Sequence, residues 1–281
     1  MTLHSRVAVL FGLAALWPLT PAHAVDYEPP IFVEPVEEYT PVEIGSGWYL
    51  RGDIGYAVSN DLGTTTFRTF DPVSATYGQG TFDTQELDSE FIFGGGFGYR
   101  YNEWLRGDFT ADGFRADFDG STSSAAPCDG GPAGTSCRTE DNAEVSAISL
   151  MANAYVDLGT YVGVTPYVGA GLGYSYVSWS DLDSQAFCVD GLASCPDGLV
   201  GTESRPGRKD WRFTYALMAG IGYDITRNMK LDVGYKYRHI DGGDMFGWDA
   251  VSAAGGATGV QGRDGDLSQH EVSVGLRYEL W

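Results

Sequence analysis

The residues that could support nucleophilic chemistry lie near the C-terminus of the 281-residue chain. Ser268 precedes His270 by two positions, and His239 ends an earlier alternating segment. A serine activated by a neighbouring histidine can hydrolyse or transfer acyl groups, including lipid acyl chains. A spacing of two places Ser268 and His270 on one strand face without implying a bond between hydroxyl and imidazole. We therefore expect no catalytic residues and interpret both histidines as structural.

Acidic and basic side chains also recur at alternate positions of the same segments, as in Arg106 with Asp108 and Lys236 with Arg238. Paired carboxylates could work as a general acid and base. Buried charges need partners, however, so a mixed-sign ion-pair network is the simpler interpretation.

A separate acidic group lies in the run Asp241-Gly242-Gly243-Asp244, with Asp249 close behind. Carboxylates suit a divalent cation, but the spacing is not that of an EF-hand loop. We expect a polar loop here, with no metal and no cofactor. The net charge of −21 argues against a nucleic-acid partner, because phosphates require Lys and Arg. Solvated loops account for the charge, and divalent-cation association at the surface is the alternative.

The four cysteines form two close pairs, Cys128 with Cys137 and Cys188 with Cys195. Pairs of this kind predict local disulfides in an oxidising compartment. Zinc is the alternative, but no histidine lies near either pair, so we expect the two disulfides.

The elements that position these residues show most clearly between Trp211 and His239. Large apolar and aromatic residues take one parity, and small or charged residues take the other. The alternation pauses only at Thr226-Arg227-Asn228, so it predicts two β-strands joined by a tight turn. These strands are longer than the usual five or six residues. An apolar face with aromatic ends and an opposite polar face are typical of strands that cross a membrane in a barrel.

The same alternation recurs along the chain and predicts eight strands. Long and short connections alternate strictly, which an outer-membrane barrel requires and a soluble sandwich does not. We therefore predict an all-β, eight-stranded, antiparallel, up-and-down transmembrane barrel with four long extracellular loops and three short periplasmic turns. The expected strands are approximately 48–58, 89–101, 104–118, 144–158, 165–179, 211–225, 229–239 and 272–280.

The third strand departs from a single phase. Apolar residues have odd numbers up to Ala111, but Phe114, Ala116 and Phe118 have even numbers. A bulge near Gly113 would shift the phase, and so would a strand that leaves the bilayer at this point.

The N-terminal region carries signals for export. An apolar run, Val7–Trp17, follows Arg6 and precedes Ala22-His23-Ala24, which is typical of a cleaved signal peptide. We expect residues 1–24 to be removed, residues 25–44 to form an acidic, proline-rich periplasmic tail, and residues 45–281 to form the barrel.

Two stretches resemble a known family. Gly47-Trp48-Tyr49-Leu50-Arg51-Gly52-Asp53-Ile54-Gly55-Tyr56 and Val274-Gly275-Leu276-Arg277-Tyr278 are similar to the ends of small Gram-negative surface-antigen barrels. These are the porin-like and opacity-type proteins, related in architecture to the transmembrane domain of OmpA. The resemblance implies an integral outer-membrane protein whose partners are lipids, lipopolysaccharide, the barrel-assembly machinery and an extracellular ligand of the loops. It also implies a C-terminal assembly signal at Tyr278, Leu280 and Trp281, although the residue in phase is Leu280 and not an aromatic one.

The charged residues of lumen parity number seven of each sign, so they could neutralise one another inside a narrow barrel. We expect a structural or surface-interaction protein whose lumen is plugged by ion pairs, and we expect loss of Arg106 and Arg212 to open a conductance. A narrow channel for small solutes is the alternative, and a lipid-modifying enzyme is a third hypothesis. The expected network comprises Arg51, Asp53, Arg106, Asp108, Asp112, Asp157, Arg212, Asp224, Lys230, Asp232, Lys236, Arg238, Arg277 and Glu279.

Overall fold

The computed structural model describes residues 47–88, 90–128, 131–189 and 198–280. The expected signal peptide and acidic tail lie outside these residues, as do Cys195 and Trp281. The described residues belong to one compact unit, Glu43–Trp281. Eight long strands form the body of this unit: β1 (Trp48–Asp61), β5 (Phe91–Arg100), β6 (Leu105–Ser124), β7 (Ser136–Asp157), β8 (Val164–Trp179), β11 (Lys209–Asp224), β12 (Met229–Ile240) and β15 (Leu267–Glu279).

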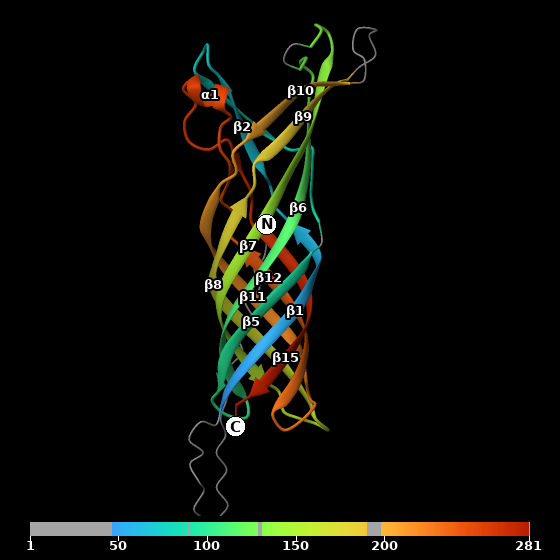
Figure 1. Cartoon of the computed structure of the whole chain (residues 1–281), viewed down its shortest axis with the longest axis vertical. Helices are drawn as coiled ribbons and strands as arrows, with labels where there is room; N and C mark the ends of the chain where they lie inside the picture. Colours follow the sequence, from blue (N-terminus) through green and yellow to red (C-terminus); the bar gives the residue numbers. More distant parts are fainter. Residues whose placement is uncertain (1–46, 89, 129–130, 190–197, 281) are drawn as a thin grey trace, which may run out of the picture. The chain divides into compact units, whose positions relative to one another are not determined.

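These long strands pair with one another in a closed ring (Figure 1). Each is antiparallel to its neighbours, from β1 through β5, β6, β7, β8, β11 and β12 to β15. The pairing of β15 with β1 completes the ring, with Ile54 opposite Val274. A ring of this kind leaves no unpaired edge along the strands that form it.

The outer face of the ring is apolar. Because side chains alternate along a strand, one parity of every long strand points outward and stays exposed. Within the described ranges, no helix is long and apolar enough to cross a membrane. The exposed apolar residues include Leu50, Ile54, Phe93, Phe97, Phe109, Ile148, Leu150, Leu172, Leu217, Ile221, Val274 and Leu276.

The phase change near Gly113 is not a bulge. β6 pairs with β7 without a register shift from Leu105 to Ser124, so even-numbered side chains point inward throughout. Phe109 is outward and 60% exposed, whereas Phe118 is inward and fully buried. The polarity of the two faces therefore inverts along one regular strand, which is the behaviour expected where a strand passes from lipid into water.

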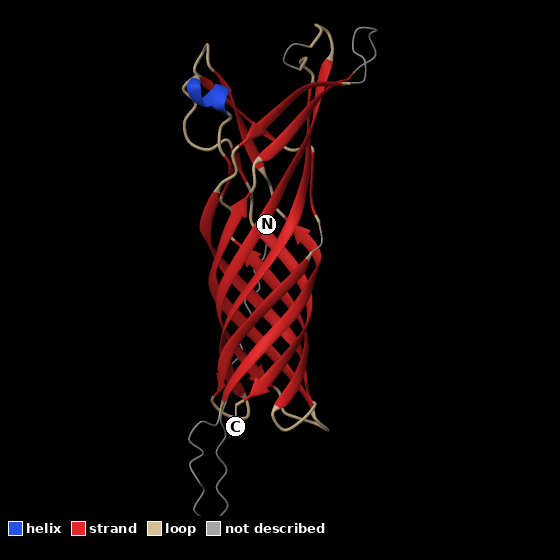
Figure 2. Ribbon diagram, viewed as in Figure 1, coloured by secondary structure: helices blue, strands red, loops and turns tan. Residues whose placement is uncertain are grey.

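Three of the four long connections contain strands of their own, and β6 and β7 extend into the fourth, which the prediction of polar loops missed (Figure 2). Among the residues that the structure describes, the main sheet has eleven strands, because β4, β9 and β10 extend it, and a second sheet of four strands lies in the order β13-β14-β2-β3. The additional elements are β2 (Thr66–Asp71), β3 (Thr76–Thr81), β4 (Thr84–Leu87), β9 (Leu182–Val189), β10 (Leu199–Arg205), β13 (Asp244–Phe246), α1 (Ala250–Ala254) and β14 (Gly262–Arg263).

An apolar core fills the interior where the long strands leave the apolar band. Phe118 and Trp179 contact each other edge to face, with ring centroids 5.7 Å apart, and Trp179 contacts Phe246 at 5.6 Å. Phe246 and Met245 belong to β13, so the connection between β12 and β15 folds inward and contributes to this core. Burial of these large side chains provides the hydrophobic stabilisation that a lipid-facing surface cannot provide.

Candidate functional site: a filled lumen and an outer cleft

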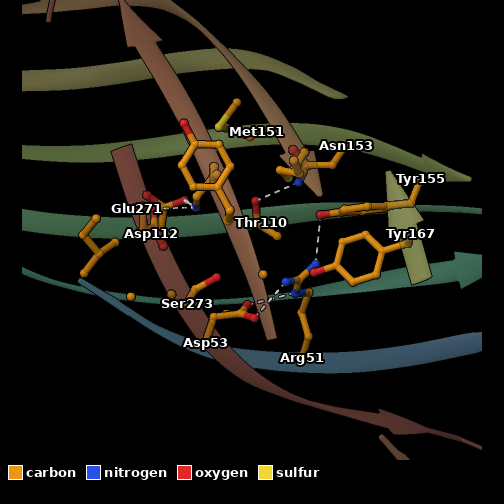
Figure 3. A pocket seen from close by; sticks show the side chains of 18 residues that line it. Arg51, Asp53, Thr110, Asp112, Met151, Asn153, Tyr155, Tyr167, Glu271 and Ser273 are labelled. Atoms are coloured by element: carbon orange, nitrogen blue, oxygen red, sulfur yellow. Dashed lines mark hydrogen bonds and ion pairs between the residues drawn. The ribbon is translucent and has the colours of Figure 1, made fainter. Parts of the chain in front are cut away.

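The first polar cluster of the lumen is built around Arg51 (Figure 3). Its guanidinium binds Asp53 in a bidentate pair, with N–O distances of 2.7 and 2.8 Å. Nη1 also donates to Asp108 at 2.8 Å and to the Tyr155 hydroxyl at 2.9 Å. Asp108 accepts a further bond from Asn153 at 2.8 Å. The cluster therefore connects side chains from β1, β6 and β7 across the bore.

Arg106 lies beside this cluster and is 1% exposed. Its Nε donates to Asp157 at 3.0 Å. Its guanidinium carbon lies 4.2 Å from the ring centroid of Tyr155 and 4.7 Å from that of Tyr167. Two aromatic faces and one carboxylate thus hold the cation in a space from which water is largely excluded.

Glycines make room for these rings. A Cβ on Gly169 would lie 2.5 Å from the Tyr155 ring. The Tyr167 hydroxyl is accommodated instead by Gly220 and Gly234. The tyrosines fill most of the space that the missing side chains would otherwise leave open.

The second polar cluster lies further along the lumen and combines two acids with two bases. Arg238 reaches Asp112 at 2.5 Å and Glu271 at 3.5 Å. Lys236 reaches Glu271 at 3.1 Å and Asp112 at 3.6 Å. A cavity of about 40 Å³ separates this cluster from Arg51, which is room for one or two water molecules.

Arg212 has partners other than those expected. Its guanidinium binds Asp264 at 2.6 Å and Asp210 at 2.8 Å. Asp264 belongs to the connection before β15 and also accepts the backbone N–H of Gly243. Burial raises the pKa of the Asp264 carboxyl above its ordinary value, against the opposing effect of the Arg212 guanidinium. Arg212 therefore anchors the inserted connection to the barrel and does not belong to the two lumen clusters.

Every residue of the expected network has an ion-pair partner within 4.0 Å. Arg277 binds Asp232 at 3.1 Å, Lys230 binds Asp224, and Glu279 binds Arg100.

Sequence reasoning missed three acids of these pairs, Glu271, Asp264 and Asp210, and Asp210 directly precedes the expected sixth strand. Glu271 continues the inward parity of Ser273 and Gly275, but the eighth strand was expected to begin one residue later. A longer strand would have included it. Asp264 gave no signal, because its position depends on how a long connection folds.

The cysteines and the C-terminal residues are the next expectations to compare with the structure. Cys128 and Cys137 are joined by a disulfide, and Cys188 is disulfide-bonded, while Cys195 lies outside the described residues. Tyr278 and Leu280 both point outward and are half exposed.

Asp241, Asp244 and Asp249, for which the sequence predicts a polar loop and no metal, have separate partners in the structure. Asp244 binds Arg263 at 2.9 Å, and Asp249 accepts N–H bonds at the start of α1, so neither is available to a shared cation.

His239 and His270 lie on the outer face of the ring, near the end that carries the long connections. Ser268 pairs with His239 on the neighbouring strand, with 3.3 Å between Oγ and Nδ1, and not with His270. The His270 Nδ1 lies 2.5 Å from the Tyr235 hydroxyl.

A larger cleft lies beyond the apolar band, between inward-facing residues of β6 and β7 and the strands of the long connections. Its volume is about 510 Å³. Phe67, Phe82 and Leu182 contribute apolar lining, and the disulfide Cys128–Cys137 lies on its wall.

Polar groups also line this cleft. Asp141 is buried and accepts hydrogen bonds from Thr139, at 2.9 Å, and from Ser184. Arg205 donates to the Ser184 hydroxyl at 2.9 Å. The cleft thus combines an apolar surface with fixed hydrogen-bonding groups, which is the usual composition of a ligand site.

Comparison with known proteins agrees with this architecture. Residues 42–279 match the family model described as "Outer membrane protein beta-barrel domain". An uncharacterized protein of Brucella suis biovar 1 is 37% identical over 268 residues, covering 89% of this chain and 90% of that protein. Outer membrane protein PagN of Salmonella typhimurium is 26% identical over 228 residues, covering 74% of this chain and 84% of PagN. Neisserial surface protein A has 20% identity and a TM-score of 0.39, covering 84% of this chain and 98% of that structure. The resemblance to outer-membrane barrels is therefore confirmed, and the chain belongs to the outer membrane protein β-barrel family as an integral outer-membrane protein.

Proposed function

We propose that the protein is a plugged, non-enzymatic barrel that carries a surface-interaction site on its extracellular side. The observation that supports this proposal is the difference in volume between the lumen cavity and the outer cleft. The lumen holds a cavity of about 40 Å³ between charged clusters, whereas the outer cleft measures about 510 Å³. The ring of eight strands serves as the membrane anchor, and the strands of the long connections form a platform for an extracellular ligand.

Conductance tests the plugged state. In a planar lipid bilayer, the wild-type protein should give no stable open level, because two charged clusters and an apolar core lie in series along the bore. A large, stable conductance would establish the alternative, a narrow channel for small solutes.

Cysteine labelling on intact cells tests the orientation. We propose that the connections between strands are extracellular where they are long and periplasmic where they are short. Ala253→Cys in α1 should react with a membrane-impermeant maleimide on intact cells. Thr160→Cys, in the short turn between β7 and β8, should react only after the outer membrane is permeabilised. The reverse pattern would show that the barrel is inserted the other way.

The lipid-modifying enzyme remains the third hypothesis, and Ser268 beside His239 is the observation that favours testing it. We propose that these residues are structural, since the Ser268 hydroxyl that lies 3.3 Å from the His239 Nδ1 also contacts the Tyr237 hydroxyl at 3.1 Å. Ser268→Ala and His239→Ala should leave lipid composition unchanged in cells that overexpress the protein. Loss of a lipid product in either variant would assign catalysis to this pair.

The ends of the chain complete the proposal. Residues 1–24 direct export, and mass spectrometry of the mature protein should find Val25 as its first residue. Residues 25–44 form the acidic periplasmic tail. The assembly machinery reads the C-terminal Tyr278, Leu280 and Trp281, and lipopolysaccharide surrounds the outer half of the anchor.

A further inference from the structure

Three potential metal ligands meet at the base of the connection between β12 and β15. His239 is near the end of β12, Asp241 follows the strand, and Asp266 directly precedes β15. The His239 Nε2 lies 3.7 Å from a carboxylate oxygen of Asp241 and 3.7 Å from one of Asp266. All three ligand atoms lie within 4.8 Å of one another. The strand pair Ile240–Leu267 brings both stems of the connection to this point.

The imidazole of His239 is held in the orientation that a ligand needs. Its Nδ1 lies 3.3 Å from the Ser268 hydroxyl, which can accept the Nδ1–H and leave the Nε2 lone pair facing the carboxylates. The Tyr215 ring packs beside the imidazole, with centroids 4.8 Å apart. Histidines that bind metals regularly have the second ring nitrogen fixed in this way. This orientation is an observation separate from the grouping of the two acids.

The charge around His239 is uncompensated. Among the ion pairs of the described residues, Asp241 and Asp266 have no basic partner except His239. Their neighbours Asp244 and Asp264 do have partners, in Arg263 and Arg212. Both free carboxylates are more than half exposed, so an ion from the medium could reach them without any rearrangement of the barrel.

We propose that His239, Asp241 and Asp266 bind one divalent transition-metal ion, with zinc as the representative. One imidazole nitrogen and two carboxylate oxygens suit Zn²⁺, whereas Ca²⁺ and Mg²⁺ prefer oxygen ligands alone. Tetrahedral zinc with bonds of about 2.0–2.1 Å needs ligand atoms about 3.3 Å apart. The exposed carboxylates reach that separation by small rotations of their side chains. A fourth position remains open to water or an external ligand.

Such an ion would join the two stems of the connection that carries β13, α1 and β14. This connection supplies Phe246 to the apolar core and also lines the outer cleft. The metal site would therefore fix the base of the platform. It does not depend on whether the lumen conducts or on which ligand the cleft takes.

Zinc titration of the full mature protein tests the proposal. Protein without a polyhistidine tag is folded into lipid vesicles, freed of metal with a chelator and titrated with ZnCl₂ in a calorimeter. The wild type should bind one zinc per chain. His239→Ala and Asp266→Asn should bind at least about tenfold more weakly, since even loss of an outer-shell partner costs that much. Two matched controls replace residues outside the proposed site: His270→Ala changes another outward histidine, and Asp244→Asn changes another nearby acid. Both variants should bind zinc like the wild type.

A second measurement keeps the test valid if a variant folds poorly. Zinc should slow protease cleavage within residues 241–266 in the wild type and in His270→Ala, and it should have no effect in His239→Ala. Heat-modifiable migration on gels verifies the barrel in each sample. No saturable zinc binding by the wild type, equal loss in His270→Ala, or equal affinity for Mg²⁺ would overturn the proposal.

Discussion

At the scale of single residues, Arg106 should contribute more to stability than any exposed charge. Replacement by alanine leaves Asp157 buried without its cation, and removal of one partner from a buried pair costs about 3–5 kcal/mol. Urea unfolding of the barrel in lipid vesicles measures this loss. The double variant Arg106→Ala/Asp157→Ala should recover part of it, because no lone charge then remains.

Arg115 provides the control on the same strand. Its partner Glu144 lies 3.2 Å away, and the Arg115 side chain is 72% exposed. Arg115→Ala should change the free energy of unfolding by no more than about 1 kcal/mol. Equal effects of the two substitutions would show that the lumen is as well solvated as the surface.

A glycine prediction concerns the close approach of Gly169 to Tyr155. An added Cβ would lie 2.5 Å from the tyrosine ring and 2.9 Å from the Ala154 carbonyl oxygen. Gly169→Ala should therefore destabilise the barrel by about 1–3 kcal/mol, as overpacked sites do. Gly52→Ala is the control, since nothing lies within 4 Å of its Cβ position. If the unfolding curves of the two variants coincide, this account of the packing is contradicted.

The sequence predicts whether a side chain of a strand points into the lumen, but it does not predict the partner of that side chain. Parity along a strand placed Arg106 and Asp157 inside, because alternate side chains must share a face. Parity does not say which strand lies opposite across the bore. The partners of Arg212 could not be inferred, since Asp264 comes from a connection whose path depends on its own packing.

At the scale of elements, β6 marks the border of the membrane. Its outward residue Ala111 lies in the apolar band, whereas outward Asp117 lies beyond it, beside Glu144 of β7. Ala111→Arg should destabilise the barrel more than Asp117→Arg does, because the cost of an outward arginine rises from about 0–1 kcal/mol near the interface to about 2–4 kcal/mol at the midplane. Asp117→Arg should cost about 0–1 kcal/mol. Refolding yield and urea unfolding in vesicles measure both, and a large penalty for Asp117→Arg would place the border further out.

Strand positions within the band were predictable, but the elements beyond it were not. Inside the membrane, lipid on one face and polar groups on the other force a clean period of two. Outside the membrane, both faces of a strand can be polar. The sequence pattern therefore predicts loops where the structure has β9 and β10. The inversion at Gly113 was visible in the sequence, and only strand pairing could distinguish a regular strand from a bulge.

At the scale of the whole molecule, we propose that the bore is closed twice. The charged clusters around Arg51 and Arg238 form one closure, and the apolar core forms the other. Resistances in series add, so either closure alone should block ions. The expectation that loss of Arg106 and Arg212 suffices for conductance must therefore be revised, because neither substitution removes the apolar core.

Two sets of substitutions separate these closures. The polar set replaces equal numbers of each sign with serine, so that the net charge of the bore does not change. The apolar set shortens three large side chains that lie beyond the band, where the paired strands of the ring remain intact. The polar set is Arg51, Asp108, Asp112 and Arg238, and the apolar set is Phe118, Trp179 and Phe246.

Each set alone should leave conductance at the wild-type level, and only the combined variant should give a stable open level in planar bilayers. Heat-modifiable migration on gels should first establish that all three variants retain the barrel. If the polar set alone conducts as well as the combined variant, the apolar core is permeable and the charged clusters are the sole closure. If the combined variant stays silent while folded, a third barrier must lie elsewhere along the bore. Conductance in the combined variant alone would show that the barrel is sealed independently by charge pairing and by hydrophobic packing.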